Sequence, residues 1–296
     1  MNTNLNINHI SLNGSKAPWL EIKNTNQQAG IIHMSAANGF TAASYLEFLN
    51  FFSDQHSITG MDCRGTWAEC ETPPPSFKMK HFADDLIQAI EQQHHKPIIG
   101  MGHSQGGFVT LLAAIKRPDL FSKIVLIEPA SLPYRWVDFF YPYIPQKLLF
   151  KFFPFMKGSL QRQRNWHSHQ QFYDRYRFHS TYKRFTDISF DNYMNYGLIK
   201  QKDQQLQLSF SPQWEAHIFS IVEFMWKYLS KITIPTLLIR AEHSNLYTQK
   251  QFIKYNKSLP NCVTTQEIAK TFHLLPLEKP QELSQIIKTW LSSNNY

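Results

Sequence analysis

Short apolar runs alternate with amphipathic stretches along most of this chain of 296 residues. The apolar runs have the length of buried strands, and the amphipathic stretches repeat their apolar residues at helical spacing. The sequence predicts strands at residues 30–34, 58–62, 97–102, 124–128, 235–240 and 263–268. It predicts helices at residues 41–53, 79–95, 105–116, 248–257 and 277–292. This alternation predicts an α/β fold with a mostly parallel sheet covered on both faces. An antiparallel pair, residues 10–12 and 19–23, is expected at the edge of the sheet.

One segment, residues 131–230, interrupts the alternation and has a different composition. It contains 26 of the 43 aromatic residues, and thirteen Lys and Arg against seven Asp and Glu. We therefore expect an insertion between two strands of the sheet. Its first part is dense enough in aromatic residues to predict an apolar substrate surface, although we expect packing against the core to account for more than half of them. These residues are Tyr134, Trp136, Phe139, Phe140, Tyr141, Tyr143, Phe150, Phe152, Phe153 and Phe155.

The net charge of +8 comes mainly from this insertion. A basic chain can bind nucleic acid, an anionic membrane surface or an acidic substrate. Charge confined to one aromatic-rich insertion favours a solvated face, or weak attraction to an anionic membrane or an acidic substrate. We do not expect nucleic acid as a partner.

Cysteine usage and the amino-terminal residues bear on the compartment. Cys63, Cys70 and Cys262 are widely spaced and form neither a disulfide framework nor a metal-binding pair. Residues 1–14 lack the basic and apolar regions of a secretory signal, and no apolar run is long enough to span a bilayer. Cytoplasmic location is the default expectation.

The sequence Gly102-His103-Ser104-Gln105-Gly106 falls between a predicted strand and a predicted helix. A G-x-S-x-G pattern alone is weak, and an ordinary glycine-rich turn is the alternative interpretation. At a strand-to-helix turn, however, it is typical of a nucleophile elbow, in which small flanking residues allow a tight turn that exposes the serine hydroxyl. Ser104 is therefore the candidate nucleophile.

A serine hydroxyl needs a neighbouring base to react at neutral pH. Of the thirteen histidines, His273 lies just after the last predicted strand and before the last helix. A turn at that end of the sheet would bring it back to Ser104. His273 is therefore the candidate base.

These motifs resemble those of the α/β-hydrolase superfamily, and especially of its cap-bearing serine hydrolases. The resemblance rests on Ala36-Ala37-Asn38-Gly39-Phe40, Asp62-Cys63-Arg64-Gly65, the sequence around Ser104, and His273 before Leu-Pro-Leu-Glu-Lys-Pro. It implies an α/β-hydrolase core of residues 1–130 and 231–296, with a helical cap inserted at residues 131–230. The core also resembles that of haloalkane dehalogenases, but with serine as the nucleophile.

The resemblance also implies an oxyanion hole. Its two donors would be the backbone N–H groups of Asn38, with Gly39 as an alternative, and of Gln105. Ala36 departs from the family pattern, because a histidine that braces this loop is usual there. The stretch beginning at Asp62 is expected to be a structural turn; a catalytic carboxylate at Asp62 is the alternative.

The third member of a triad orients the histidine and stabilises its charged form. The family usually places this acid after the strand that follows the cap, where this chain has Asn245, which carries no charge. Glu128 is the natural candidate, because some haloalkane dehalogenases place their acid at the end of the corresponding strand. Glu242, or a Ser–His dyad held by Asn245, are the alternatives.

The function implied by the resemblance is hydrolysis of a small-molecule carboxylic ester with an apolar acyl or aryl group through an acyl-enzyme. It implies neither a metal nor an organic cofactor. A thioesterase or carbon–carbon bond hydrolase with the same triad is the first alternative. A catalytically silent, ligand-binding hydrolase fold is the second, raised by Ala36 and Asn245.

Overall fold

The computed structural model describes residues 5–202 and 204–293. Residues 1–4 and 294–296, at the two ends of the predicted core, and residue 203, in the predicted insertion, lie outside the described part. Eight strands form one sheet in the order β1-β2-β4-β3-β5-β6-β10-β11. All pairs from β4 to β11 are parallel, and β1 and β2 add antiparallel at one edge, as the sequence predicted. The strands are β1 (Leu5–Leu12), β2 (Ser15–Ile22), β3 (Gly30–Ser35), β4 (His56–Met61), β5 (Ile98–His103), β6 (Phe121–Ile127), β10 (Thr236–Ala241) and β11 (Val263–Ile268).

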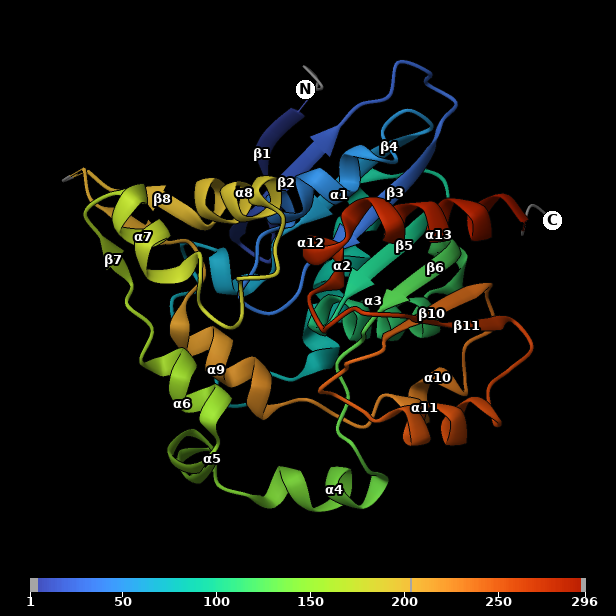
Figure 1. Cartoon of the computed structure of the whole chain (residues 1–296). Helices are drawn as coiled ribbons and strands as arrows, with labels where there is room; N and C mark the ends of the chain where they lie inside the picture. Colours follow the sequence, from blue (N-terminus) through green and yellow to red (C-terminus); the bar gives the residue numbers. More distant parts are fainter. Residues whose placement is uncertain (1–4, 203, 294–296) are drawn as a thin grey trace.

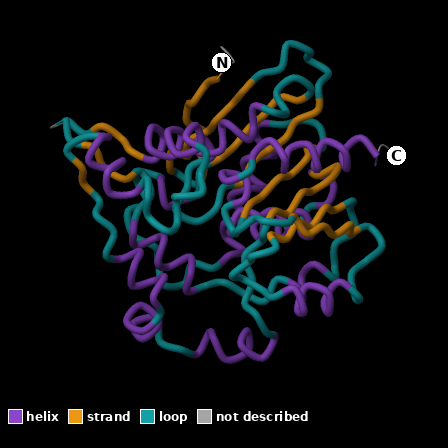
Figure 2. The backbone as a smooth tube through the Cα atoms, viewed as in Figure 1, coloured by secondary structure: helices purple, strands orange, loops and turns teal. Residues whose placement is uncertain are grey.

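Helices cover both faces of this sheet (Figure 1 and Figure 2). Successive residues of a strand point to opposite faces, so Val125 and Ile127 of β6 join one hydrophobic cluster while Ile124 and Leu126 join another. The first cluster includes residues of α1 (Leu46–Asn50), α12 (Leu275–Glu278) and α13 (Pro280–Ser293). The second includes residues of α2 (Met79–Gln93), α3 (Gln105–Lys116) and α11 (Gln249–Asn256). The α/β-hydrolase arrangement expected from the sequence is confirmed.

Two predicted helices are interrupted in the structure. The predicted helix 41–53 begins as a 3-10 turn, Ala42–Tyr45, before α1. The predicted helix 277–292 starts earlier, as α12, and restarts as α13 at Pro280. Proline lacks an N–H and clashes with the preceding turn, so a helix stops before it and a new one can begin with it.

The insertion between β6 and β10 fills the left and lower parts of the view in Figure 1. Besides its helices it contains a small antiparallel sheet, which the sequence did not predict. Its helices are α4 (Arg135–Phe140), α5 (Gln146–Phe152), α6 (Pro154–Leu160), α7 (His169–Tyr176), α8 (Asp187–Gly197), α9 (Pro212–Ser220) and α10 (Trp226–Leu229). The small sheet has the order β7-β9-β8, formed by β7 (Asn165–Trp166), β8 (Leu198–Lys200) and β9 (Leu206–Leu208). The boundaries at residues 131 and 230 stay a prediction.

The first part of the insertion differs from the expectation that packing buries most of its aromatic residues. Of the ten named above, only Tyr141 is buried and Phe150 half-buried. The other eight are exposed. Helix α4 buries none of its residues, α5 buries only Leu149, and α6 buries only Met156 and Ser159. We call the outward surface of residues 134–160 the α4–α6 face. Among the described residues, no helix is both long and apolar enough to cross a membrane.

Candidate active site

Ser104 lies on the tight turn between β5 and α3. Its backbone has φ 52° and ψ −118°, a left-handed conformation that a residue with a side chain rarely adopts. A Cβ added at Gly102 would overlap the carbonyl group of Gly106, and one added at Gly106 would overlap the carbonyl oxygen of Ser35. The chain can therefore make this turn, and present the Ser104 hydroxyl at the end of the helix, only with glycine at both positions.

His273 lies between the side chains of Ser104 and Glu128. Its Nε2 is 3.0 Å from Ser104 Oγ, and its Nδ1 is 3.2 Å from Glu128 Oε2. The three residues follow β11, β5 and β6, whose carboxyl ends meet at the same edge of the parallel sheet. The structure thus brings together the three residues that the sequence analysis singled out.

The carboxylate of Glu128 is fully buried. A buried charge is tolerated only when its lone pairs are occupied. Glu128 Oε1 accepts a hydrogen bond of 2.7 Å from Ala241 N, and Oε2 accepts one of 2.7 Å from the Ser244 hydroxyl as well as facing His273. Glu128 itself has φ 45°, so the backbone after β6 is also held in a left-handed conformation. These bonds fix the carboxylate in one orientation toward the imidazole.

The other candidates for the acid are not brought to His273. Glu242 is exposed and accepts a hydrogen bond of 2.6 Å from Lys270 N. The neighbour of Asn245, Ser244, supports Glu128 instead. The end of β10 and the loop after it therefore contribute hydrogen-bond donors to the Glu128 carboxylate, from Ala241 N and the Ser244 hydroxyl. Sequence reasoning missed Ser244, because nothing local shows which residue of that loop faces β6.

The loop after β3 turns at Gly39, which has φ 84°. Phe40 N donates to Ala37 O across 3.1 Å, which closes the turn. The backbone N–H groups of Asn38 and Gln105 have no acceptor among the described residues, and so are available to a ligand. The side chain of Asn38 is engaged, because its Nδ2 donates to Glu215 O of α9 across 2.9 Å.

Tyr45 and His103 connect this loop to the backbone of His273. His103 Nε2 lies 2.8 Å from His273 O, and its Nδ1 lies 2.7 Å from Tyr45 Oη. A carbonyl oxygen can only accept, so Nε2 carries the proton and Nδ1 accepts from the Tyr45 hydroxyl. Tyr45 Oη in turn accepts from Ala37 N at 3.2 Å. Burial holds the pKa of His103 well below its usual value, which keeps the ring neutral, as this chain of bonds requires.

The insertion supports the loop from the other side. Arg162 pairs with Glu215 at 2.6 Å and donates to Tyr193 Oη at 2.6 Å. This ion pair is mostly buried and lies against Gly39. Tyr45 from the core and Glu215 from the insertion thus hold the loop in a chain that has Ala36 in place of the usual histidine.

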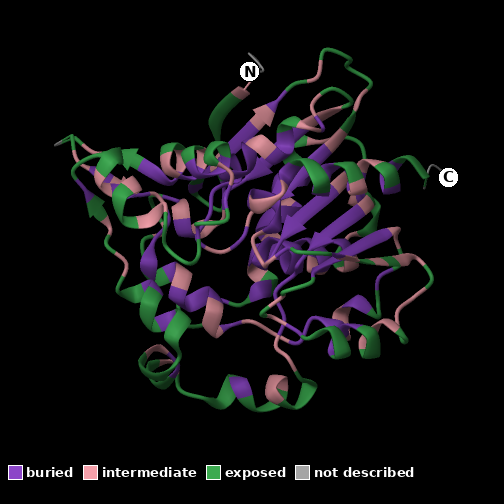
Figure 3. Ribbon diagram, in the orientation of Figure 1, coloured by how far each residue is buried: buried purple, intermediate pink, exposed green. Residues whose placement is uncertain are grey.

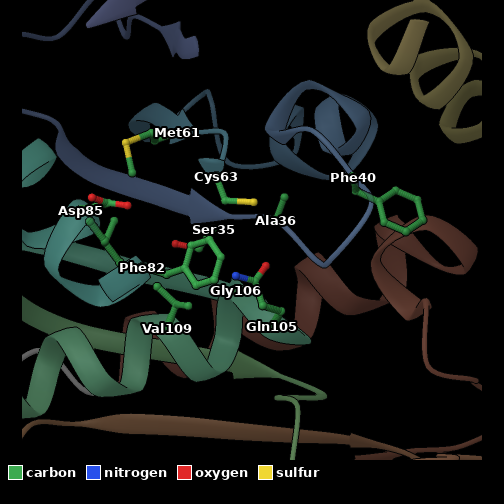
Figure 4. Close-up of a pocket in the computed structure, with 11 residues that line it drawn as sticks. Ser35, Ala36, Phe40, Met61, Cys63, Phe82, Asp85, Gln105, Gly106 and Val109 are labelled. Carbon is green, nitrogen blue, oxygen red and sulfur yellow. The ribbon is translucent and has the colours of Figure 1, made fainter. Parts of the chain in front are cut away.

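A cavity of about 30 Å³ lies behind this loop, between β3, β4, α2 and α3 (Figure 4). Ala36, Cys63, Phe82 and Gln105 are among the side chains around it. The small side chain of Ala36 contributes to this space, which a histidine would reduce.

Asp62 is in a structural position. Its Oδ1 accepts a hydrogen bond of 2.6 Å from Ala42 N, and its carbonyl oxygen accepts one from Trp67 Nε1. Burial raises the pKa of this carboxyl to about 7. The structure therefore agrees with the expected turn, and Asp62 makes no hydrogen bond to His273 among the described residues.

The fold and the serine at the strand-to-helix turn define a class of enzyme. Residues 36–280 match the family described as the alpha/beta hydrolase fold. The chain belongs to this family, and it is a hydrolase of the α/β fold.

Similar proteins span nearly the whole chain. The uncharacterized hydrolase YugF of Bacillus subtilis (strain 168) is 22% identical over 276 residues, which cover 90% of this chain and 92% of that protein. The crystal structure of E-2-(acetamidomethylene)succinate hydrolase superposes with a TM-score of 0.79 at 17% identity, covering 97% and 99% of the two chains. The thioesterase domain from the curacin biosynthetic pathway superposes with a TM-score of 0.73 at 13% identity, covering 96% and 99%. At these identities, the superposition on the two solved structures shows the shared fold alone.

The turn at Ser104 predicts opposite effects for two glycine substitutions. Gly106→Ala should lower the free energy of unfolding by about 3 kcal/mol or more, because its methyl group meets backbone that cannot move aside. Gly158→Ala is the matched control: a Cβ there meets nothing within 4 Å, so it should raise the stability of α6 by about 0.5–1 kcal/mol. Urea denaturation measures both, and equal effects of the two substitutions would contradict the assigned turn.

The bonds of Tyr45 predict a cost for removing its hydroxyl. Tyr45→Phe leaves Ala37 N and His103 Nδ1 without a partner, so we expect it to lower the free energy of unfolding by about 1–3 kcal/mol. Tyr247→Phe is the matched control, because that hydroxyl is buried and has no partner among the described residues. It should be neutral or stabilising. A Tyr45→Phe protein as stable as wild type would show that the connection to His103 does not hold the loop.

Proposed function

We propose that this protein is a serine hydrolase of carboxylic esters, with Ser104 as nucleophile, His273 as base and Glu128 as acid. The observation that carries the proposal is the position of His273, within hydrogen-bond reach of both Ser104 Oγ and the Glu128 carboxylate. A hydroxyl, a base and a group that orients the base are the arrangement that activates a serine.

In the proposed reaction, Ser104 Oγ attacks the carbonyl carbon of the ester while its proton passes to His273 Nε2. The carbon–oxygen bond to the alcohol breaks, and the alcohol leaves with that proton. Water then attacks the acyl-enzyme, His273 takes a proton from it and returns it to Ser104, and the carboxylic acid is released. Glu128 faces His273 Nδ1 and stabilises the positive charge on the imidazole.

We assign the oxyanion hole to the backbone N–H groups of Asn38 and Gln105. Their lack of other acceptors among the described residues supports this role. Each donor of such a pair is typically worth about 3 kcal/mol in the transition state. Tyr45 and Glu215 are positioning residues in this proposal, since they hold the loop that presents Asn38.

The charges near the loop favour an uncharged acyl group over an acidic one. Arg162 is the cation that lies against Gly39, and Glu215 already neutralises it. A substrate carboxylate at this position would have to compete with Glu215 in a mostly buried ion pair. We therefore propose an ester with an apolar acyl or aryl group, covered by the insertion acting as a cap. The fold similarity to a thioesterase domain makes thioesters the second class to test.

Reaction with a fluorophosphonate probe tests the nucleophile. We expect the probe to label the wild-type protein and not Ser104→Ala, because only an activated serine attacks phosphorus at a useful rate. Thermal unfolding of both proteins controls for loss of fold. Absence of labelling, together with no hydrolysis of p-nitrophenyl esters or thioesters of any chain length, would favour a silent ligand-binding protein.

Substitution of the two competing acids tests the role of Glu128. Glu128→Gln should lower kcat by roughly 10³–10⁴-fold, with KM much less affected, because a neutral amide cannot stabilise the imidazolium. Glu242→Gln is the matched control, since Glu242 is exposed and bonded to Lys270 N. It should turn over ester at close to the wild-type rate. If the two variants exchanged these behaviours, Glu242 would be the acid.

A further inference from the structure

Exposed apolar side chains are concentrated on the α4–α6 face. Sixteen large hydrophobic residues are exposed among those described, and eleven of them lie within residues 134–160. Figure 3 shows α4, α5 and α6 as mostly exposed ribbon at the bottom of the view. Scattered apolar residues are normal on a protein surface. A large group of them marks a site that binds a membrane, another protein or a ligand.

The outward side chains leave much of their surface exposed. Leu149 of α5, Met156 of α6 and Tyr141 of the 3-10 turn between α4 and α5 pack around Ala216 of α9 in a separate small cluster. The outward side chains are among the most exposed of the chain, with Tyr143 at 77%, Phe155 at 68% and Phe152 at 67%. Nothing in the described part of the chain covers them.

The charges of the α4–α6 face all have the same sign where they reach solvent. Arg135, Lys147, Lys151 and Lys157 are exposed. The one acidic residue of the segment, Asp138, is mostly buried and paired with Lys227 at 2.7 Å. Lys151 also lies over the ring of Phe152, with Nζ 5.3 Å from its centroid. The face therefore presents aromatic rings surrounded by uncompensated positive charge.

We propose that the α4–α6 face docks on the surface of a lipid bilayer that contains anionic lipids. Aromatic rings are stabilised at the boundary between headgroups and acyl chains, and lysines beside them are attracted to lipid phosphates. The exposed aromatic side chains of α4, α5 and α6 would enter this boundary. A second copy of the same face is the poorer occupant, because symmetric pairing would bring four exposed cations against four.

This docking connects to the candidate active site through the packing of the insertion. Helix α6 packs on α9, and α9 carries Glu215, whose backbone oxygen holds Asn38. A bilayer bound at α4–α6 would thus lie against the same helical layer that supports the oxyanion loop. The docking itself does not depend on the proposed chemistry, and its test uses Ser104→Ala so that no lipid is hydrolysed.

Co-sedimentation with vesicles is the direct test. We expect the full chain carrying Ser104→Ala to bind phosphatidylcholine vesicles that contain phosphatidylglycerol at least ~10-fold more tightly than vesicles of phosphatidylcholine alone. Added salt should weaken the binding, because it screens exposed charges. Absence of binding to the anionic vesicles at low salt would overturn the proposal.

Two triple variants separate the apolar from the electrostatic contribution. Lys147→Gln with Lys151→Gln and Lys157→Gln should weaken binding by on the order of 100-fold, from roughly fivefold for each lysine. Trp136→Ser with Phe152→Ser and Phe155→Ser should weaken it by roughly 10-fold or more, including on neutral vesicles. Both variants should unfold at the wild-type temperature, since the altered side chains are exposed.

Matched controls change the same residue types elsewhere on the surface. The charge control is Lys80→Gln, Lys96→Gln and Lys250→Gln, and the apolar control is Ile188→Ser, Ile199→Ser and Ile253→Ser. Both controls should bind vesicles as the parent does; losses equal to those of the α4–α6 variants would overturn the proposal. Size-exclusion chromatography with light scattering tests pairing with a second copy. The proposal would also be overturned if the protein failed to bind vesicles and formed a dimer that the triple variant containing Trp136→Ser converts to a monomer.

Discussion

The buried carboxylate of Glu128 is the constraint on which the arrangement of the candidate site depends. A negative charge without solvent must have its oxygens occupied, and here the partners are Ala241 N, the Ser244 hydroxyl and His273. Ala241 ends β10, Ser244 follows it and His273 follows β11, while Glu128 follows β6. Because the buried carboxylate needs all of these partners, it fixes the loops after β6, β10 and β11 relative to each other. It also orients His273 toward Ser104.

A second set of contacts makes up for a residue that the chain lacks. Ala36 cannot brace the loop after β3 as the usual histidine would. Tyr45 and His103 hold the loop from inside the core, and Glu215 holds it from the insertion. Neutral His103 suits this role, because burial disfavours its charged form and both ring nitrogens are used. The insertion is thus part of the support of the loop.

Much of the fold could be predicted because its signals are local. The helix at 105–116 and the strand at 263–268 match α3 and β11 in both bounds, since a periodic apolar pattern specifies the element directly. The sheet β7-β9-β8 was missed because strands of two or three residues are too short for a pattern. The expectation that packing accounts for more than half of the aromatic residues in residues 134–155 was wrong, as the exposed Phe152 and Phe155 show. The sequence pattern of a short aromatic-rich helix is the same whether or not another part of the chain covers it.

The sequence by itself determined the turn at Ser104, since Gly102 and Gly106 are required by steric exclusion within a few residues of it. It also singled out His273 and Glu128 by their places at strand ends. The tertiary structure decided the remaining questions, because they concern residues far apart in the chain. Whether Glu128 or Glu242 faces His273, which residue after β10 supports the carboxylate, and which aromatic residues stay exposed all depend on which surfaces the folded chain brings into contact.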